Sequence, residues 1–187
     1  LDGTEITGKT PRQILDSGLG YVPEDREHDG LIGSFTVTEN LVLDQVSNSP
    51  YSSGGVLKHS VIDNKADDLI QEFDVRTQAA AAPVSSLSGG NKQKVVMARE
   101  MSRELRVLVA AQPTRGVDVG SIEFLHKRIV AERERGAAVL IISSELDEIY
   151  ALSDRIAVMY RGAIIGLVGP ETSRDDMGLL MAGVTND

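Results

Sequence analysis

Cysteine is absent from this 187-residue chain, which excludes disulfide bridges and thiolate metal sites and suits a reducing compartment. Tryptophan is absent too, aromatic residues make up only 4%, and the longest apolar stretches are too short to cross a bilayer. An excess of basic residues is also missing: the formal net charge is −9, and no basic stripe marks a nucleic-acid interface. We therefore expect no nucleic-acid partner, and any membrane association must run through other proteins.

The segments that are present alternate between short apolar strands and helices. With 41% hydrophobic residues, a chain of this length can bury one sizeable core. Such alternation favours an α/β fold, with a parallel sheet flanked by helices. The strands are expected at 19–22, 107–111, 138–143 and 156–160, the helices of this region at 121–135 and 145–152, and a turn at 161–162.

A second group of segments is helical without intervening strands. Thr36-Val-Thr-Glu39 is a capping box that precedes an apolar helix, and 57–75 has the spacing of an amphipathic helix. A polar loop at 47–55 separates the two, so the pattern predicts a small helical subdomain. Near the end of the chain, Ser173 is placed to cap a last helix.

The segment Leu87-Ser-Gly-Gly-Asn-Lys-Gln-Lys94 has the character of a phosphate-binding helix start. Ser88 is a favourable N-cap, and the following glycines leave backbone N–H groups uncovered where the helix dipole is positive. The helix is expected over 91–103. Its inward residues would be Val95, Ala98 and Met101, and its solvent-facing ones Lys92, Lys94, Arg99 and Arg103. The plainer interpretation is an ordinary capped surface helix.

A second motif follows about one helix later, at Val107-Leu-Val-Ala-Ala-Gln-Pro-Thr-Arg-Gly-Val-Asp118. Together the two resemble the signature segment and D-loop of ABC transporter ATPases. Tyr21-Val-Pro-Glu-Asp-Arg26 and Ser143-Ser-Glu-Leu146 are similar, more narrowly, to the second, C-terminal cassette of fused bacterial importers of simple sugars or nucleosides. Ala110-Ala-Gln-Pro-Thr-Arg-Gly116 favours the nucleoside branch.

The resemblance implies a P-loop NTPase core of the ABC type, divided into a helical subdomain at 36–88, a signature helix and core at 89–170, and a C-terminal helix at 171–187. The phosphate loop Gly-x-x-x-x-Gly-Lys-Ser/Thr occurs nowhere in the chain. Since the chain also opens at Leu1 without methionine, we expect a partial ABC ATPase domain spanning 1–187, with the first strands and the phosphate loop lying before Leu1.

The resemblance also assigns site residues. Those expected to contact nucleotide are Ser88, Gly89, Gly90, Asn91, Glu24 and Asp118, with Glu24 at the usual Q-loop glutamine and Asp118 as an inter-cassette contact. Ala111 stands where an aspartate would hold magnesium, so no metal ligand is expected from this chain. Gln112 stands at the catalytic glutamate, and Ser144 at the switch histidine. Both catalytic positions are expected to be degenerate.

The function implied is that of a nucleotide-binding domain energising import of a nucleoside or simple sugar, peripheral to the cytoplasmic face of the membrane. ATP and magnesium would be bound together with a first ATP-binding cassette, to which this chain would contribute its signature. Further partners would be the transmembrane permease subunits and, indirectly, a substrate-binding protein. The alternative is a non-catalytic dimerisation and coupling module that transmits closure to the membrane subunits.

Overall fold

The computed structural model describes residue 1 and residues 3–184, arranged in two compact units, Leu1–Ile142 and Ser143–Asp187. In the first unit, the helices are α1 (Pro11–Asp16), α2 (Val37–Val42), α3 (His59–Glu72), α4 (Gly89–Met101) and α5 (Val119–Glu134), with a π-helical turn η1 (Arg26–Gly30) and a 3-10 turn η2 (Val84–Ser86). Its strands are β1 (Leu19–Val22), β2 (Ser52–Ser53), β3 (Val56–Leu57), β4 (Val107–Ala111) and β5 (Ala138–Ile142).

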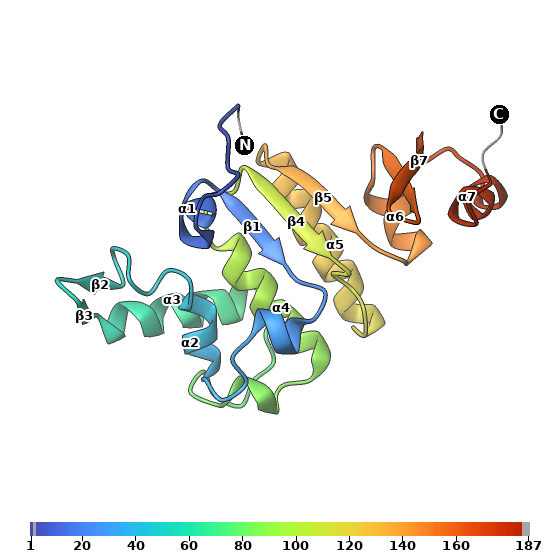
Figure 1. Cartoon of the computed structure of the whole chain (residues 1–187). Helices are drawn as coiled ribbons and strands as arrows, with labels where there is room; N and C mark the ends of the chain where they lie inside the picture. The colour runs from blue at the N-terminus through green and yellow to red at the C-terminus, as the bar shows by residue number, and fades with distance from the viewer. Residues whose placement is uncertain (2, 185–187) are drawn as a thin grey trace. The chain divides into compact units, whose positions relative to one another are not determined.

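The centre of the first unit is a parallel sheet in the order β1-β4-β5. Leu108 and Ala110 of the middle strand are fully buried, and α4 and α5 lie on one face of the sheet (Figure 1). Parallel strands need helical crossovers to return the chain, which is why helices separate them in sequence. The α/β class and these three strands are as predicted.

The helical part of the first unit also follows its local signals. The Thr36 Oγ1 accepts a hydrogen bond from the Glu39 N–H at 3.1 Å, while Glu39 Oε2 accepts one from the Thr36 N–H at 2.7 Å, so both halves of the capping box form. Helix α3 buries Ile62 and Leu69. The predicted polar loop at 47–55 differs in one respect, because its end pairs with the next residues as the small hairpin β2–β3.

The second unit consists of α6 (Leu146–Leu152), β6 (Ile156–Tyr160), β7 (Ala163–Val168) and α7 (Arg174–Met181). The turn at Arg161-Gly162 is present, with φ of 47° and 83°. It joins β6 to β7 as an antiparallel hairpin, a pairing that was not predicted from the sequence for 156–160. A two-residue turn with positive φ favours a β-hairpin, in which the second strand runs antiparallel to the first. Strand β7 was not predicted from the sequence.

Within 1 and 3–184, no helix combines the length and apolar character needed to cross a membrane.

Candidate functional site

Helix α4 begins at Gly89, two residues earlier than predicted, and Ser88 is its N-cap. The Ser88 Oγ accepts hydrogen bonds from the Asn91 N–H at 3.4 Å and from Asn91 Nδ2 at 2.9 Å. Ser88 is exposed, Gly89 is half-buried and Gly90 is buried. Because amides in the first turn of a helix have no intrahelical acceptor, the Gly89 and Gly90 N–H groups are available donors at the positive end of the helix dipole.

The rest of α4 is buried nearly all round, which corrects the prediction of a solvent-facing basic side. Lys94 and Arg99 are buried, and the side chains of Lys92 and Arg103 are only 12% and 14% exposed. Lys94 Nζ bonds Asp74 Oδ2 at 2.8 Å, and Arg99 Nη1 bonds the Gly30 carbonyl at 2.8 Å. These partners lie far away in sequence, so helical spacing alone could not reveal them.

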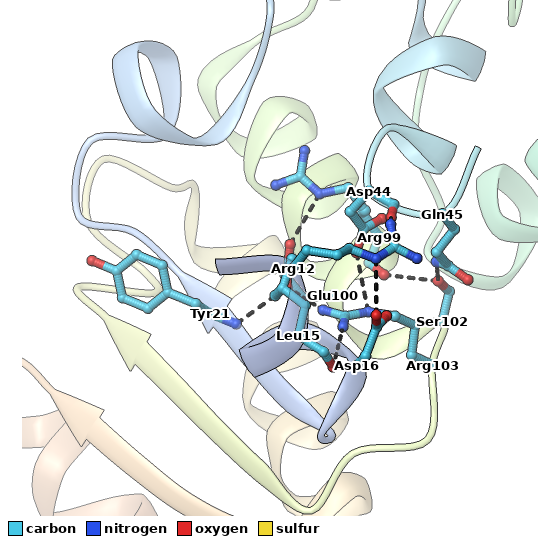
Figure 2. A network of polar contacts seen from close by, with 10 residues as sticks. All are labelled: Arg12, Leu15, Asp16, Tyr21, Asp44, Gln45, Arg99, Glu100, Ser102 and Arg103. Carbon is cyan, nitrogen blue, oxygen red and sulfur yellow. Dashed lines mark hydrogen bonds and ion pairs between the residues drawn. The ribbon is translucent and has the colours of Figure 1, made fainter. Parts of the chain in front are cut away.

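The C-terminal end of α4 is held by the polar network of Figure 2. Glu100 accepts from Arg99 at 3.0 Å, from Arg103 at 2.8 Å and from the backbone N–H of Tyr21 in β1 at 3.1 Å. Arg103 Nε also lies 3.1 Å from the Asp44 carboxylate, beyond α2. These contacts hold the C-terminal end of α4 in place, and the helix carries Gly89 and Gly90 at its other end.

The loop after β4 lies against that N-terminus. Asp118 caps α5, accepting from the Ser121 N–H at 3.0 Å and from the Ser121 hydroxyl at 2.9 Å, and this hydroxyl bond is the main reason why the pKa of Asp118 is lowered. A Cβ placed on Gly90 would lie 2.8 Å from Asp118 Oδ2. Only glycine therefore fits at position 90 without displacing the aspartate.

The two residues at the end of β4, Ala111 and Gln112, differ from each other in conformation and chemistry. Ala111 is buried and its methyl group offers no oxygen to a cation. Gln112 has φ of 50°, unusual for a residue with a side chain, and its N–H donates to the Ile142 carbonyl at 2.7 Å. Ser144 is exposed just before α6 and belongs to the second unit.

The turn after β1 makes ionic contacts on two sides. Glu24 Oε1 lies 2.5 Å from Arg115 Nη1 in the loop after β4, and Glu27 Oε1 lies 3.0 Å from Lys92 Nζ in the first turn of α4. Arg26 Nη1 donates to the Arg115 carbonyl at 2.7 Å. The structure thus brings Glu24 and Asp118 to the loop that borders Ser88, Gly89 and Gly90.

These groups fit an anion better than a cation. The start of α4 offers N–H donors, whereas the side chain of Ala111 has no oxygen and Glu24 is already paired with Arg115. Across the described residues, no cluster of three or more histidine, aspartate or glutamate side chains could hold a metal ion. The arrangement can grip a phosphate, and magnesium would need ligands from elsewhere.

Sequence reasoning missed the basic partners of this region. Arg26 was quoted only as the last residue of the motif at 21–26, and neither Arg115 nor Lys92 was assigned to the site. No local pattern marks them, because each partner is brought in by the fold. The glycine at position 116 is a weak local signal of a sharp turn, and in the structure its φ is 64°.

The fold is that of the ABC ATPases. The family model described as ABC transporter matches residues 1–115, and the chain belongs to that family. A solved structure of the ATP-binding cassette MJ0796, bound to ADP and Pi, superposes with a TM-score of 0.75 over 92% of this chain and 73% of that one at 18% identity, which supports the fold.

Two curated relatives are much more similar in sequence. The chain is 49% identical over 186 residues to the guanosine import ATP-binding protein NupO of Bacillus subtilis (strain 168), covering 99% of this chain and 36% of that protein. It is 48% identical over 184 residues to the nucleoside import ATP-binding protein NupA of Lactococcus lactis subsp. cremoris (strain MG1363), covering 98% and 36%. The chain thus spans about a third of the length of these relatives.

Proposed function

We propose that this chain is part of the nucleotide-binding subunit of an importer, and that its transported class is the nucleosides. The similarity to relatives named for guanosine and nucleoside import supports this, at 49% and 48% identity. Likeness to the glucose import protein TsgD13 of Haloferax volcanii is lower, at 41% over 98% of this chain. Simple sugars are therefore the second choice.

The role we assign to the chain is to supply its signature to ATP bound by a first cassette. The observation that carries this proposal is the start of α4, where exposed Ser88 precedes the first-turn amides of half-buried Gly89 and buried Gly90, and these groups can donate to a γ-phosphate. Asn91 supports Ser88 through its side-chain amide. Asp118, which abuts Gly90, would lie at the contact between cassettes.

We further infer that the chain's own catalytic positions are degenerate. Ala111 cannot hold magnesium, and Gln112 can orient a water molecule but cannot take its proton. Ser144 replaces the histidine expected near the γ-phosphate. Bound magnesium would neutralise charge on the phosphates, and its ligands would come from the partner cassette and the nucleotide. Glu24 would lie beside that site without binding magnesium, because its carboxylate is paired with Arg115.

The partners follow from this role. The chain would work with a first cassette and with transmembrane permease subunits at the cytoplasmic face of the membrane, and a substrate-binding protein would act through the permease. A non-catalytic coupling module is the second candidate, favoured by the absence of a side-chain oxygen at Ala111. The two differ in whether Ser88 matters to nucleotide binding.

Titration calorimetry distinguishes the signature role from the coupling module. MgATP is titrated into the chain alone, into a family cassette that carries its own phosphate loop, and into their mixture. We expect the mixture to bind more tightly than the cassette alone, and Ser88→Arg to abolish the gain. Ser53→Arg, at an exposed serine of β2, is the matched control. A complex that forms but is indifferent to Ser88→Arg would favour the coupling module, and binding by the chain alone would contradict the trans role.

A further inference from the structure

The guanidinium of Arg26 lies between two glycines that are 27 residues apart in sequence, at Gly89 and Gly116. A Cβ on Gly89 would stand 2.8 Å from Arg26 Nη2, and a Cβ on Gly116 would stand 3.4 Å from the same atom. A Cβ on Gly89 would also stand 3.4 Å from the Gly116 carbonyl oxygen. The start of α4 and the loop after β4 therefore meet at this side chain, which crowds position 89 and lies in ordinary contact distance of position 116.

Hydrogen bonding fixes the orientation of Arg26. Its Nη1 donates to the Arg115 carbonyl at 2.7 Å, and its Nε is buried with no hydrogen-bond partner among the described residues. The turn that carries it is set by Asp25, whose Oδ1 accepts from the N–H groups of Glu27 and His28, both at 3.0 Å. The guanidinium is thus held by one strong bond and by close packing against the glycines.

The charges beside Arg26 join the same two elements. Glu24 pairs with Arg115 on the loop, and Glu27 pairs with Lys92 on α4. The Glu24–Arg115 pair is exposed on both sides and contributes little stability singly, whereas Lys92 is largely buried in its pair with Glu27. Arranged on both sides of Arg26, however, they bind one short turn to the start of the helix and to the loop at once.

We propose that Arg26 is a positioning residue that sets the spacing between the signature glycines and the loop 115–118, so that both face the partner's nucleotide as one unit. This inference rests on the proposed function. Arg26 does not touch the nucleotide in this account: it acts through Gly89 and Gly116. The substitution Arg26→Met keeps the apolar stem and removes the donors and the planar group.

Hydrogen exchange on the chain alone tests the spacing without any nucleotide. We expect Arg26→Met to speed exchange of the hydrogen-bonded amides in 88–92 and 115–118, which are those of Asn91, Lys92, Arg115 and Val117, and to leave α3 and β5 unchanged. Arg155→Met, at an exposed arginine of the second unit, is the matched control. Unchanged exchange in both segments would overturn the inference.

A double-mutant cycle tests the packing. Gly89→Ala should destabilise the wild-type chain by displacing Arg26, and should cost less when Arg26 is already Met or Lys, because the crowding atom is gone. Urea unfolding of the four chains measures the coupling. Additive effects would overturn the inference. If Arg26→Met does not fold, the cycle with Arg26→Lys decides the question.

Nucleotide binding then links the spacing to function. In the mixture with a complete cassette, Arg26→Met should weaken MgATP binding roughly two- to thirtyfold, the range for residues that couple without touching ligand. Binding that responds to Ser88→Arg but not to Arg26→Met would refute the positioning role and leave the proposed function standing. If Ser88→Arg does not change MgATP binding in the mixture, the proposed function is contradicted. The hydrogen-exchange result then still tests whether Arg26 sets the spacing.

Discussion

At the scale of single residues, the charged side chains of α4 act as structural elements. Lys94 illustrates this, because its ammonium group donates to Asp74 and lies 5.0 Å from the centroid of the Phe124 ring. The Asp74 side chain is 56% exposed, and its pKa is lowered chiefly by the hydrogen bond from Lys94. A basic residue on a helix was thus an unreliable guide to solvent exposure here.

We expect Lys94→Met to reduce the free energy of unfolding by about 1–3 kcal/mol, because two hydrogen bonds from a buried donor are lost. Lys127→Met is the control: Lys127 is 73% exposed and pairs with Glu123 one turn away, so its loss should change stability by at most about 0.5 kcal/mol. Urea unfolding of both variants gives the comparison. Equal effects would show that the burial of Lys94 does not matter.

Asp44 is a buried carboxylate whose loss of hydration is poorly compensated by hydrogen bonds. Its two oxygens have no hydrogen-bond partner among the described residues, although Arg103 Nε lies 3.1 Å away. Burial is the main cause that raises the pKa of Asp44, and the Arg103 charge opposes it. A carboxyl whose pKa is higher in the folded state binds protons more readily when folded, so it lowers stability as pH rises through the interval between the unfolded and folded pKa values.

The wild-type chain should therefore lose stability relative to Asp44→Asn as the pH is raised from below the ordinary aspartate pKa of 3.8 to neutrality. Urea unfolding of both chains along this pH series, with exposed Asp63→Asn as control, isolates the contribution of Asp44. A difference in stability that grows in favour of the wild type with rising pH would mean that the Arg103 charge dominates instead.

At the scale of elements, caps determine where helices begin. Thr36, Ser88, Asp118 and Ser173 are all N-caps whose side chains accept a first-turn N–H. Three of these were expected from the sequence because caps are local signals. Asp118 was instead assigned to an inter-cassette contact, and the structure adds the capping of α5 to that prediction.

The two roles of Asp118 can be separated by substitution. Asp118→Ala should destabilise the chain by about 0.5–2 kcal/mol through loss of the cap, whereas Asp118→Asn keeps the cap and should stay near wild type. Thermal unfolding measures this effect. If Asp118→Asn nevertheless weakens MgATP binding in the mixed-cassette titration, its charge serves the contact between cassettes. If Asp118→Ala leaves the melting temperature unchanged, the cap is not a source of stability.

At the scale of the whole molecule, one face of the parallel sheet is apolar and exposed. Tyr21, Val109 and Leu140 are paired across β1, β4 and β5, and Tyr21, Leu140 and Ile142 are 48%, 54% and 51% exposed. Apolar faces of this kind are interaction surfaces or aggregation liabilities. The chain should therefore associate as its concentration rises.

The double variant Leu140→Lys/Ile142→Lys should lower both association and binding of an apolar dye. Val119→Lys, at an isolated side chain that is 84% exposed, should change neither. Sedimentation at several concentrations, together with dye fluorescence, compares the three chains. Equal association in all of them would mean that the sheet face is not the contact surface.

The sequence by itself determined the strands at 19–22 and 107–111, a third strand predicted at 138–143 and found at Ala138–Ile142, and the caps at Thr36, Ser88 and Ser173, because alternation and capping act over a few residues. Tertiary structure alone decided the burial of Lys94 and Arg99 and the meeting of Arg26 with Gly89 and Gly116. Ion pairs and close packing join residues distant in sequence, and such pairings depend on the folded arrangement of the strands and helices that carry them.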